Sequence, residues 1–581
     1  MPRRGRRRTV RLLVPLLVVS LAGCASIPTS GPVKAGGDPR LQRVEDVVRS
    51  IGQPPTPGAS PEDIVLGFLQ SSADFQGDHE VARLYLAPRA RQRWRPQAGT
   101  VVADRVAPLD LSRGVLSVEG SEIGRIDSEG TFRRSPSGTT VTRGFGMERV
   151  DGEWRIAKLD DGLMLSSVDV AESYRQISLY FLAPSGSTLV PDVVLLPELP
   201  GLTTKLVARL LRGPTAAMRD ALDTGFPQGT GLEVGSVPVR DGIATVRLNA
   251  AALQADDNTR ERMSAQIVWT LTQLSEVLLV RITAGGEPLL VSGVAEDQDR
   301  DVWPTYDPDQ LPPSPSAYVA QDGRIGRYLE GQFEPVPGVA GTGEPALRTP
   351  AVSLDASRVA AVSTDGRTVY VGGLARTEGL LPRVRGTDLS PPSWDRGNNL
   401  WVVDRATGQL WYLANGANAP QEVSVADTPR LTAVAVARDG TRVALIVGAG
   451  KSARVKVGPI VRVETADPDI ESGEAVSITS LHEPVPDLRS VRDVAWADAV
   501  TLAVLGSRDE LPVAPYYVGT NGYTITDTDP LADPVSITAA PPLQPQESPL
   551  VVGTSEGELM QFTSSGGWQP LGVGTDPAYP G

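Results

Sequence analysis

Residues 353–371, SLDASRVAAVSTDGRTVYV, decide the fold of the larger part of the chain. Two short apolar runs are separated by a polar turn, which is typical of two adjacent β-strands. Blocks of the same kind recur along the second half of the chain. They are SWDRGNNLWVVDRATGQLWYL (393–413), AVARDGTRVALIV (435–447), DVAWADAVTLAVLG (493–506) and SPLVVGTSEGELMQF (548–562).

The spacing of these blocks predicts a β-propeller over residues 317–581. Their centres are Tyr318, Val359, Leu400, Val443, Leu502 and Leu550. Turn-separated strands with a period of roughly 40–45 residues indicate propeller blades. We therefore expect about six blades, with an insertion between Val443 and Leu502. We also expect one blade to be built from both ends of this domain, which would close the ring and protect its edges.

A first small domain is expected over residues 60–169. Ser60 is a plausible N-cap, with Pro61 and two acidic residues in the first helical turn. A second helix is expected over 80–87, closing at Pro88, and strands follow. Asp151-Gly152 predicts a hairpin turn. Two helices followed by a bent sheet resemble the nuclear-transport-factor-like α+β domains, whose cone either holds a ligand or is empty.

A second domain is expected over residues 176–292. A helix stops at Gly213-Pro214, a hairpin turns at Asp241-Gly242, and a second helix carries Met263, Ile267, Leu271 and Leu274 on one face. The segments LLRGP, PQGT, VRDGIATVRLN and AQIVWTLTQL resemble the GerMN domain, which is named for a spore-germination protein. The resemblance implies a compact α+β domain.

The start of the chain has the order of a secretory signal. Arginines at 3–8 precede an apolar run over 10–21, which is shorter than the roughly 20 residues that span a bilayer. LAGC, residues 21–24, then resembles a bacterial lipobox, and Cys24 is the only cysteine in the chain. This implies cleavage after residue 23 and a lipidated cysteine, N-palmitoyl and S-diacylglycerol Cys24. Because several acyl chains anchor a protein stably, we expect the mature chain to lie on the extracytoplasmic face of the cell membrane.

Two further segments have the composition of connections. Residues 24–59 are rich in Pro, Gly and Ser and predict a flexible tether. Residues 298–316, QDRDVWPTYDPDQLPPSPS, are acidic and Pro-rich and predict a linker before the propeller. The chain as a whole carries a net charge of −14, which argues against a nucleic-acid partner because such binding needs a basic surface.

The residues that carry most enzyme chemistry are scarce. The two histidines, His79 and His482, fall in different expected domains, so a histidine-based hydrolase or a Cys/His zinc site is not expected. Five aspartates, Asp355, Asp395, Asp439, Asp493 and Asp498, could form a carboxylate pair of the glycosidase type. The position of Asp355, Asp395 and Asp439 before blade strands favours a turn-capping role instead. GAGKS, residues 448–452, lacks the first glycine of a phosphate loop, since Leu445 stands there.

Tryptophans of the expected propeller admit two interpretations. They are Trp394, Trp401, Trp411, Trp496 and Trp568. Such rings either form a sugar-binding surface or pack between blades, and the second role is the commoner one. We expect no catalytic residue, no metal and no cofactor, and a protein that is not an enzyme.

The order of lipobox, α+β domain, GerMN domain and propeller resembles the LpqB-like lipoproteins of actinobacteria along essentially the full length. The resemblance implies a partner, the extracytoplasmic domain of an MtrB-type sensor histidine kinase. It also implies a role in envelope homeostasis and division. Two alternatives stay open. One is a lipoprotein that binds peptidoglycan or another wall glycan, and the other is a carboxylate-dependent glycosidase of the propeller.

Overall fold

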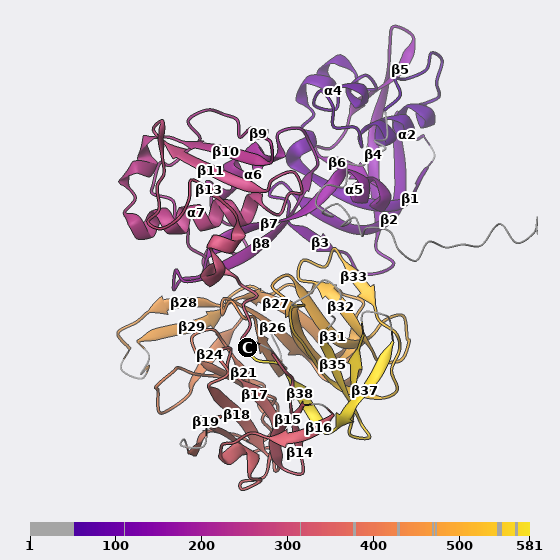
Figure 1. Ribbon diagram of the computed structural model, residues 1–581. Coiled ribbons are helices and arrows are strands. Elements are labelled where there is room, and N and C mark those ends of the chain that lie inside the picture. The colour runs from indigo at the N-terminus through magenta and orange to yellow at the C-terminus, as the bar shows by residue number, and fades with distance from the viewer. Residues whose placement is uncertain are drawn as a thin grey trace, which may run out of the picture. The chain divides into compact units, whose positions relative to one another are not determined.

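The computed structural model describes residues 52–581 with a few internal gaps. The gaps are 110, 314, 330, 376–378, 427–429, 468–469, 471–472, 543–548 and 564–566. Cys24, the expected signal segment and most of the expected tether lie outside the described residues. Figure 1 shows two α+β domains followed by a domain made of strands.

The first domain begins with three short helices. Ser60 caps α2 (Pro61–Ser71) as predicted, because its hydroxyl accepts from the Asp63 N–H and Asp63 bonds back to the Ser60 N–H. The second predicted helix is wrong in its extent. Helix α3 (Glu80–Arg83) ends after one turn, and Leu86 pairs with Ile156 of the sheet. Pro88 then starts a new helix, α4 (Pro88–Arg93), since proline suits the first helical position.

A bent sheet of six strands packs against these helices. The strands are β1 (Gly99–Pro108), β2 (Val115–Asp127), β3 (Phe132–Arg134), β4 (Thr140–Val150), β5 (Glu153–Lys158) and β6 (Leu163–Leu165). Their order is β5-β4-β2-β1-β6, with β3 paired to β2. The predicted Asp151-Gly152 turn joins β4 to β5, with positive φ at both residues. This arrangement is compatible with a nuclear-transport-factor-like domain.

The second domain is built around one buried helix, α7 (Asp257–Leu271). Every residue from Met263 to Leu271 is buried. The helix packs on β7 (Tyr174–Leu182) and on α6 (Leu202–Leu210). The predicted Asp241-Gly242 turn is present, although its first arm is short. The remaining elements are α5 (Ser167–Ser173), β8 (Leu189–Pro197), β9 (Val239–Arg240), β10 (Ile243–Leu248), β11 (Leu279–Ala284), β12 (Glu287–Pro288) and β13 (Asp297–Gln298).

The expected linker over 298–316 is instead packed along most of its length, and we call it the strap. Trp303 and Tyr306 are 3% and 4% exposed and belong to the core of the second domain. Gln310 accepts a hydrogen bond from Arg396 of the propeller at 3.0 Å. The linker prediction rested on the acidic and Pro-rich composition of this segment. Composition does not show that Trp303 and Tyr306 are buried in the second domain. The strap therefore joins the second domain to the propeller through specific contacts.

The expected tether is likewise shorter than its composition indicates. Gln53 accepts hydrogen bonds through its carbonyl from the Ser71 hydroxyl and the Tyr85 hydroxyl, at 3.2 and 2.8 Å. The Gly58 N–H donates to Glu153 at 2.8 Å. Residues 53–58 are thus fastened to the first domain before α2 begins.

The third domain is a propeller of six blades, numbered here in chain order. Blade 1 is β16-β15-β14-β38, blade 2 is β17-β18-β19-β20, and blade 3 starts as β21-β22-β23-β24. Blade 4 is β25-β26-β27, blade 5 is β30-β31-β32-β33 and blade 6 is β34-β35-β36-β37. Blade 1 combines both ends of the domain as predicted, because Tyr318 in β14 pairs with Ala578 in β38.

The bounds of the propeller strands follow the blade order. Blades 1 and 2 comprise β14 (Tyr318–Gln321), β15 (Arg324–Leu329), β16 (Gln332–Pro335), β38 (Thr575–Ala578), β17 (Leu347–Val352), β18 (Arg358–Ser363), β19 (Thr368–Gly373) and β20 (Leu380–Arg385). Blades 3 and 4 comprise β21 (Ser393–Trp394), β22 (Leu400–Asp404), β23 (Gln409–Leu413), β24 (Gln421–Val425), β25 (Leu431–Val436), β26 (Arg442–Val447) and β27 (Arg454–Pro459). Blades 5 and 6 comprise β30 (Arg489–Asp498), β31 (Thr501–Ser507), β32 (Ala514–Gly519), β33 (Ile525–Asp527), β34 (Pro534–Ala539), β35 (Leu550–Thr554), β36 (Glu558–Phe562) and β37 (Trp568–Val573).

The insertion expected between Val443 and Leu502 extends the preceding blade. It forms a hairpin, β28 (Val461–Glu464) and β29 (Glu474–Ile478). Strand β29 pairs in parallel with β24, so blade 3 gains two outer strands. The chain then returns to blade 4 at residues 479–482, where His482 pairs with Val457.

Candidate functional site

Four of the five predicted aspartates cap turns. Each carboxylate accepts a hydrogen bond from the backbone N–H two residues further on, which is the geometry of an Asx turn. The donors are Ser357 to Asp355 at 3.0 Å, Gly397 to Asp395 at 2.9 Å, Thr441 to Asp439 at 2.8 Å and Val500 to Asp498 at 2.7 Å. An aspartate therefore caps a turn in four of the blades.

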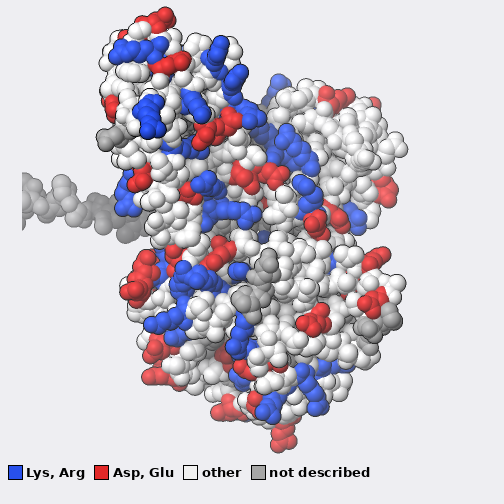
Figure 2. All heavy atoms as spheres, turned by 180° about the vertical axis from the view of Figure 1, so that it is seen from behind, with Lys and Arg blue, Asp and Glu red and all other residues white. Residues whose placement is uncertain are grey.

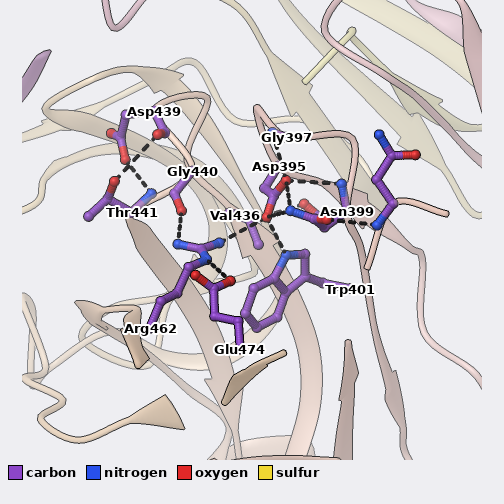
Figure 3. Close-up of polar contacts among 12 residues, drawn as sticks. Asp395, Gly397, Asn399, Trp401, Val436, Asp439, Gly440, Thr441, Arg462 and Glu474 are labelled. Carbon is purple, nitrogen blue, oxygen red and sulfur yellow. Dashed lines mark hydrogen bonds and ion pairs between the residues drawn. The ribbon is translucent and has the colours of Figure 1, made fainter. Parts of the chain in front are cut away.

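Asp395 shows how completely such a carboxylate is used (Figure 3). Besides its turn bond, it accepts from the Asn399 N–H at 3.0 Å and from the Trp401 indole at 3.2 Å. Arg462, from the inserted hairpin, donates to it at 2.9 Å and to the Gly440 carbonyl of blade 4 at 2.7 Å. The residue is 2% exposed. This cluster fastens the insertion to blades 3 and 4 and leaves Asp395 no access to a substrate.

Asp355 and Asp439 are also held by neighbours. Burial acts to raise the pKa of the Asp355 carboxyl, but hydrogen bonds from Ser353, Ser357 and Asn398 outweigh it and lower that pKa to about 2. Asp439 forms a buried ion pair with Arg442 at 2.5 Å. The fold itself therefore stabilises the charged form of Asp355, and Asp439 is held in place by its ion pair.

Asp493 differs from the other four because it lines the axial channel of the propeller. Its two oxygens accept from the N–H groups of Val494 and of Ile537 in blade 6, at 2.9 and 2.8 Å. Burial raises the pKa of this carboxyl to about 7, and the Asp576 carboxylate adds to the rise. The channel has a volume of about 100 Å³, whereas small-molecule sites usually measure at least about 300 Å³. Its size does not suit a glycosidase cleft.

Arg438 lines the same channel and ties several blades together. It donates to the carbonyls of Trp496 in blade 5, Ala539 in blade 6 and Pro580 after β38, at 2.9, 2.8 and 3.4 Å. Burial lowers the pKa of this guanidinium to about 10, against the opposing charges of Asp309 and Asp498. Asp309 belongs to the strap, and burial together with Asp498 raises the pKa of its carboxyl to about 7. The strap thus reaches the channel residues.

The predicted tryptophans serve blade packing. Trp394 donates to the Ala351 carbonyl of the preceding blade at 3.1 Å, and Trp496 donates to Ala435 of its preceding blade at 2.9 Å. Trp401 is fully buried against Tyr412. Trp411 packs on the core of blades 2 and 3, and Trp568 packs on Phe562. These tryptophans therefore hold neighbouring strands and blades together.

The two histidines lie apart and are both structural. His79 is buried between Phe75 and Trp94 and contacts the Ser72 carbonyl at 3.1 Å. His482 contacts the Thr520 carbonyl at 2.7 Å. Burial lowers the pKa of both rings. GAGKS forms a short turn between β26 and β27 of one blade, as predicted. Among the residues the structure describes, no group of three or more His, Cys, Asp or Glu could hold a metal.

The junction at which all three domains meet was not among the features predicted from the sequence. Its centre is residues 127–137 of the first domain, here called the bridging segment. Toward the second domain, the Gly130 carbonyl accepts from the Leu195 N–H at 2.8 Å, and Glu129 accepts from the Ala216 N–H at 3.0 Å. Arg209 also donates to the Glu129 carbonyl.

The same segment contacts the propeller on its other side. Arg134 donates to the carbonyls of Gly522 and Tyr523 at 2.7 and 3.0 Å. The Ser137 hydroxyl donates to Asp487 at 2.7 Å, and Phe132 packs edge-on against Tyr523. Beside these contacts is a cleft with a volume of about 480 Å³, within the range of ligand sites. We call it the junction cleft. The only local signal for this junction was an Asn-Gly pair at 521–522. Such a pair predicts a turn, but it does not predict which segment the turn contacts.

Surface charge on the face opposite that of Figure 1 is mixed. Figure 2 shows Lys and Arg interspersed with Asp and Glu over the described residues of that face. Such a face lacks the broad basic stripe that nucleic-acid binding requires. Within the described part of the chain, no helix is long and apolar enough to cross a bilayer.

These features define a class of protein: two α+β domains and a six-bladed propeller, joined by a strap and a bridging segment. Family models match the same three parts. They are described as "Lipoprotein LpqB, N-terminal domain" over 54–171, "Sporulation and spore germination" over 178–290 and "Lipoprotein LpqB beta-propeller domain" over 323–580. The chain belongs to the LpqB lipoprotein family.

Its relatives match over nearly the whole length. "Lipoprotein LpqB" of Thermobifida fusca is 32% identical, covering 97% of this chain and 97% of the relative. "Lipoprotein LpqB" of Streptomyces avermitilis is also 32% identical, covering 99% of each. Among solved structures, the tandem GerMN domains of GerM from Bacillus subtilis are 18% identical, covering 27% of this chain and 59% of that one with a TM-score of 0.20. The family assignment rests on the full-length relatives.

Proposed function

We propose that this chain is a lipid-anchored accessory protein on the extracytoplasmic face of the membrane, where it modulates an MtrB-type sensor histidine kinase. The observation that carries the proposal is the full-length match to lipoproteins of the LpqB family. The LAGC motif at residues 21–24 supplies the site of anchoring, Cys24. Envelope homeostasis and division are the processes in which such a kinase would act.

The contacts between domains support a protein that acts by binding a partner. The strap and the bridging segment join the domains by hydrogen bonds and buried aromatic rings. A body held in this way can favour one conformation of a partner, and preferential binding shifts the population of the partner's states. Anchoring both proteins in one membrane raises their effective concentration, so weak contacts suffice.

The test uses the full chain and the full kinase in the same vesicles. We expect the wild-type chain to bind the kinase and to change its rate of autophosphorylation. A Cys24→Ala chain at equal bulk concentration should remain in solution and lose most of that change, because the effective concentration falls. If the wild-type chain neither binds the kinase nor alters its autophosphorylation, the proposed partner is wrong. If Cys24→Ala stays acylated and membrane-bound, the proposed anchor is wrong.

A separate measurement distinguishes the wall-binding alternative. Purified cell wall is sedimented with the full chain at physiological salt. The kinase proposal does not require the chain to sediment with the wall. Co-sedimentation together with an inactive kinase assay would replace the kinase with wall glycan as the partner.

A further inference from the structure

The junction cleft is built by all three domains. The first domain contributes residues 131–133, the second contributes 191–193, 215–218 and 220, and the propeller contributes 457–459, 479–482 and 520–521, together with Arg442. Ligand sites occur preferentially at domain interfaces. The inserted hairpin of blade 3 delivers residues 479–482 to this wall.

A buried hydrogen-bond donor in the cleft has no partner. Asn521 is 8% exposed, and its Oδ1 accepts from the Tyr523 N–H at 3.0 Å. This bond identifies Nδ2 as the free end of the amide. Nδ2 is buried and bonds to none of the described residues. Buried polar groups are nearly always satisfied, so an orphan donor in a cleft wall points to a ligand atom that accepts from it.

A guanidinium stands in the same wall without an opposite charge. Arg133 is exposed and pairs with Arg125 of β2 through its backbone, whereas no ion pair or hydrogen bond joins its guanidinium to another described residue. Arg442 also lines the cleft, and Asp439 engages only its Nε and Nη2 atoms. A free guanidinium and a free amide donor in one cleft favour an acceptor-rich, negatively charged group, since guanidinium matches carboxylate and phosphate geometry.

Two carboxylates of the second domain also line the cleft, and both must be accommodated. Asp192 is buried and accepts from the Thr215 N–H and hydroxyl at 2.7 and 3.0 Å. Burial raises the pKa of this carboxyl, and both of its oxygens are occupied by Thr215. Asp220 is exposed. A carboxylate at that position accepts from a hydroxyl of the ligand and opposes a second anionic group.

The rest of the wall mixes hydroxyls with apolar surface. Thr131, Thr479 and Ser480 supply hydroxyls, and Met218 and Leu481 supply apolar contact. Hydroxyls that both donate and accept suit a sugar ring, whose C–H face packs on apolar side chains. A volume of about 480 Å³ admits such a ring with substituents.

We propose that the junction cleft binds an acidic saccharide, with its anionic group on Arg133 and Asn521 and its ring hydroxyls toward Asp220 and the hydroxyl side chains. The anionic group is a carboxylate or a phosphate. This site is independent of the kinase proposed above, because it requires only a small ligand. Since the cleft walls come from three domains, an occupied cleft also holds those domains together.

Calorimetric titration of the full chain at about 150 mM salt tests the proposal. Three sugars share one ring: N-acetylmuramic acid carries a carboxylate, N-acetylglucosamine 1-phosphate carries a phosphate, and N-acetylglucosamine is neutral. We expect at least one acid to bind about tenfold or more tightly than the neutral sugar, which is the order of one charge-assisted hydrogen bond. The better acid identifies the source of the negative charge.

Three variants locate the binding. Arg133→Gln removes an exposed charge and should weaken binding of the acid at least tenfold. Asn521→Asp keeps the Oδ1 acceptor for Tyr523, replaces the free donor by an oxygen and should abolish binding. Arg89→Gln removes an exposed arginine from α4, outside the cleft, and should leave binding unchanged.

Each contrary outcome overturns the proposal. No binding of either acid at millimolar concentration means that the cleft is not an acidic-sugar site. Equal binding of the neutral sugar removes the role of charge. Unchanged binding by Arg133→Gln, or an equal loss in Arg89→Gln, shows that the charge acts elsewhere. The kinase assay is unaffected by any of these results, so the two proposals fail separately.

Discussion

The axial channel and the junction cleft are both lined by arginine and aspartate, yet their polar groups are used differently. In the channel, Arg438 donates to three carbonyls and Asp493 accepts from two N–H groups. In the cleft, Arg133 has no ion pair with any described residue, and the Nδ2 atom of Asn521 is unpaired. The partnered charges of the channel hold blades together, although two channel hydroxyls, Thr349 Oγ1 and Ser536 Oγ, also have no partner. In the cleft, an unpartnered guanidinium and an unpartnered amide donor mark surface available to a ligand.

The largest expected effect follows from replacing Arg438 with methionine. The change keeps an unbranched side chain but leaves three buried carbonyls without their donor. We expect the propeller to lose about 3–5 kcal/mol of stability, because breaking a buried charged network leaves its partners unpaired. For a domain of this size, the melting temperature should fall by roughly 6–15 °C, measured by calorimetry.

Arg89→Met is the matched control, since Arg89 is exposed on α4. It should change stability by less than about 0.5 kcal/mol. An Arg438→Met loss no larger than this control would mean that the channel arginine does not join the blades.

The second prediction concerns the pH dependence of the channel. The pKa of Asp493 is about 7 in the fold and about 3.9 when unfolded. The folded state therefore favours the neutral carboxyl, and this stabilisation is complete below about pH 4 and disappears as pH rises through 7. A shift of three units corresponds to at most about 4 kcal/mol. Asp493→Asn should flatten the fall in stability between pH 4 and 7, measured by urea unfolding at several pH values.

This test compares how steeply the free energy of unfolding changes with pH, not its absolute value. Asparagine offers only one acceptor to the N–H groups of Val494 and Ile537, so the variant is less stable at low pH. Asp576 and Arg405 also act on this carboxyl, and Asp309 titrates in the same range. Asp309→Asn should therefore remove a further part of the slope. Identical slopes in Asp493→Asn and wild type would show that Asp493 is charged in the fold.

Much of the local structure was predictable from the sequence, because it depends on neighbours within a few residues. The Ser60 cap, the Asp-Gly turns and the turn aspartates are each fixed by contacts within five positions. The period of the strand blocks predicted the blades, and the short first block together with the strand-rich end of the chain predicted the closure of the ring. The strap over 298–316 was missed because Trp303 and Tyr306 are buried by residues of another part of the chain.

The junction cleft could not be predicted from residues that are close together in the sequence. Arg134 contacts residues 388 and 389 positions further along the chain, and no periodic pattern encodes such a pair. Equally, the sequence did not separate Asp493 from Asp498, but of these two only Asp493 lines the channel. Which blade turn faces which neighbour is decided by the packing of whole domains.

The third prediction sharpens the comparison by loosening the cleft. Arg134→Ala removes two hydrogen bonds from the bridging segment to the carbonyls of Gly522 and Tyr523. We expect a loss of about 1–2 kcal/mol, smaller than for Arg438 because Ser137 and Phe132 still contact the propeller. Hydrogen exchange should increase at residues 519–523 and 127–137 while the blade strands stay protected. Faster exchange throughout the propeller would mean that the junction supports the blades themselves.

The fourth prediction has the smallest expected effect on stability, and it best separates an arginine needed by the fold from one available to a ligand. Arg133→Gln should change the stability of the free protein by less than about 0.5 kcal/mol, because this guanidinium has no partner to lose. Arg438 and Arg133 would then be two arginines of opposite kind, one needed by the fold and one reserved for a ligand. A loss above about 1 kcal/mol for Arg133→Gln would reveal an intramolecular role. The distinction between the partnered arginine of the channel and the unpartnered arginine of the cleft would then no longer hold, even if the variant also failed to bind a sugar acid.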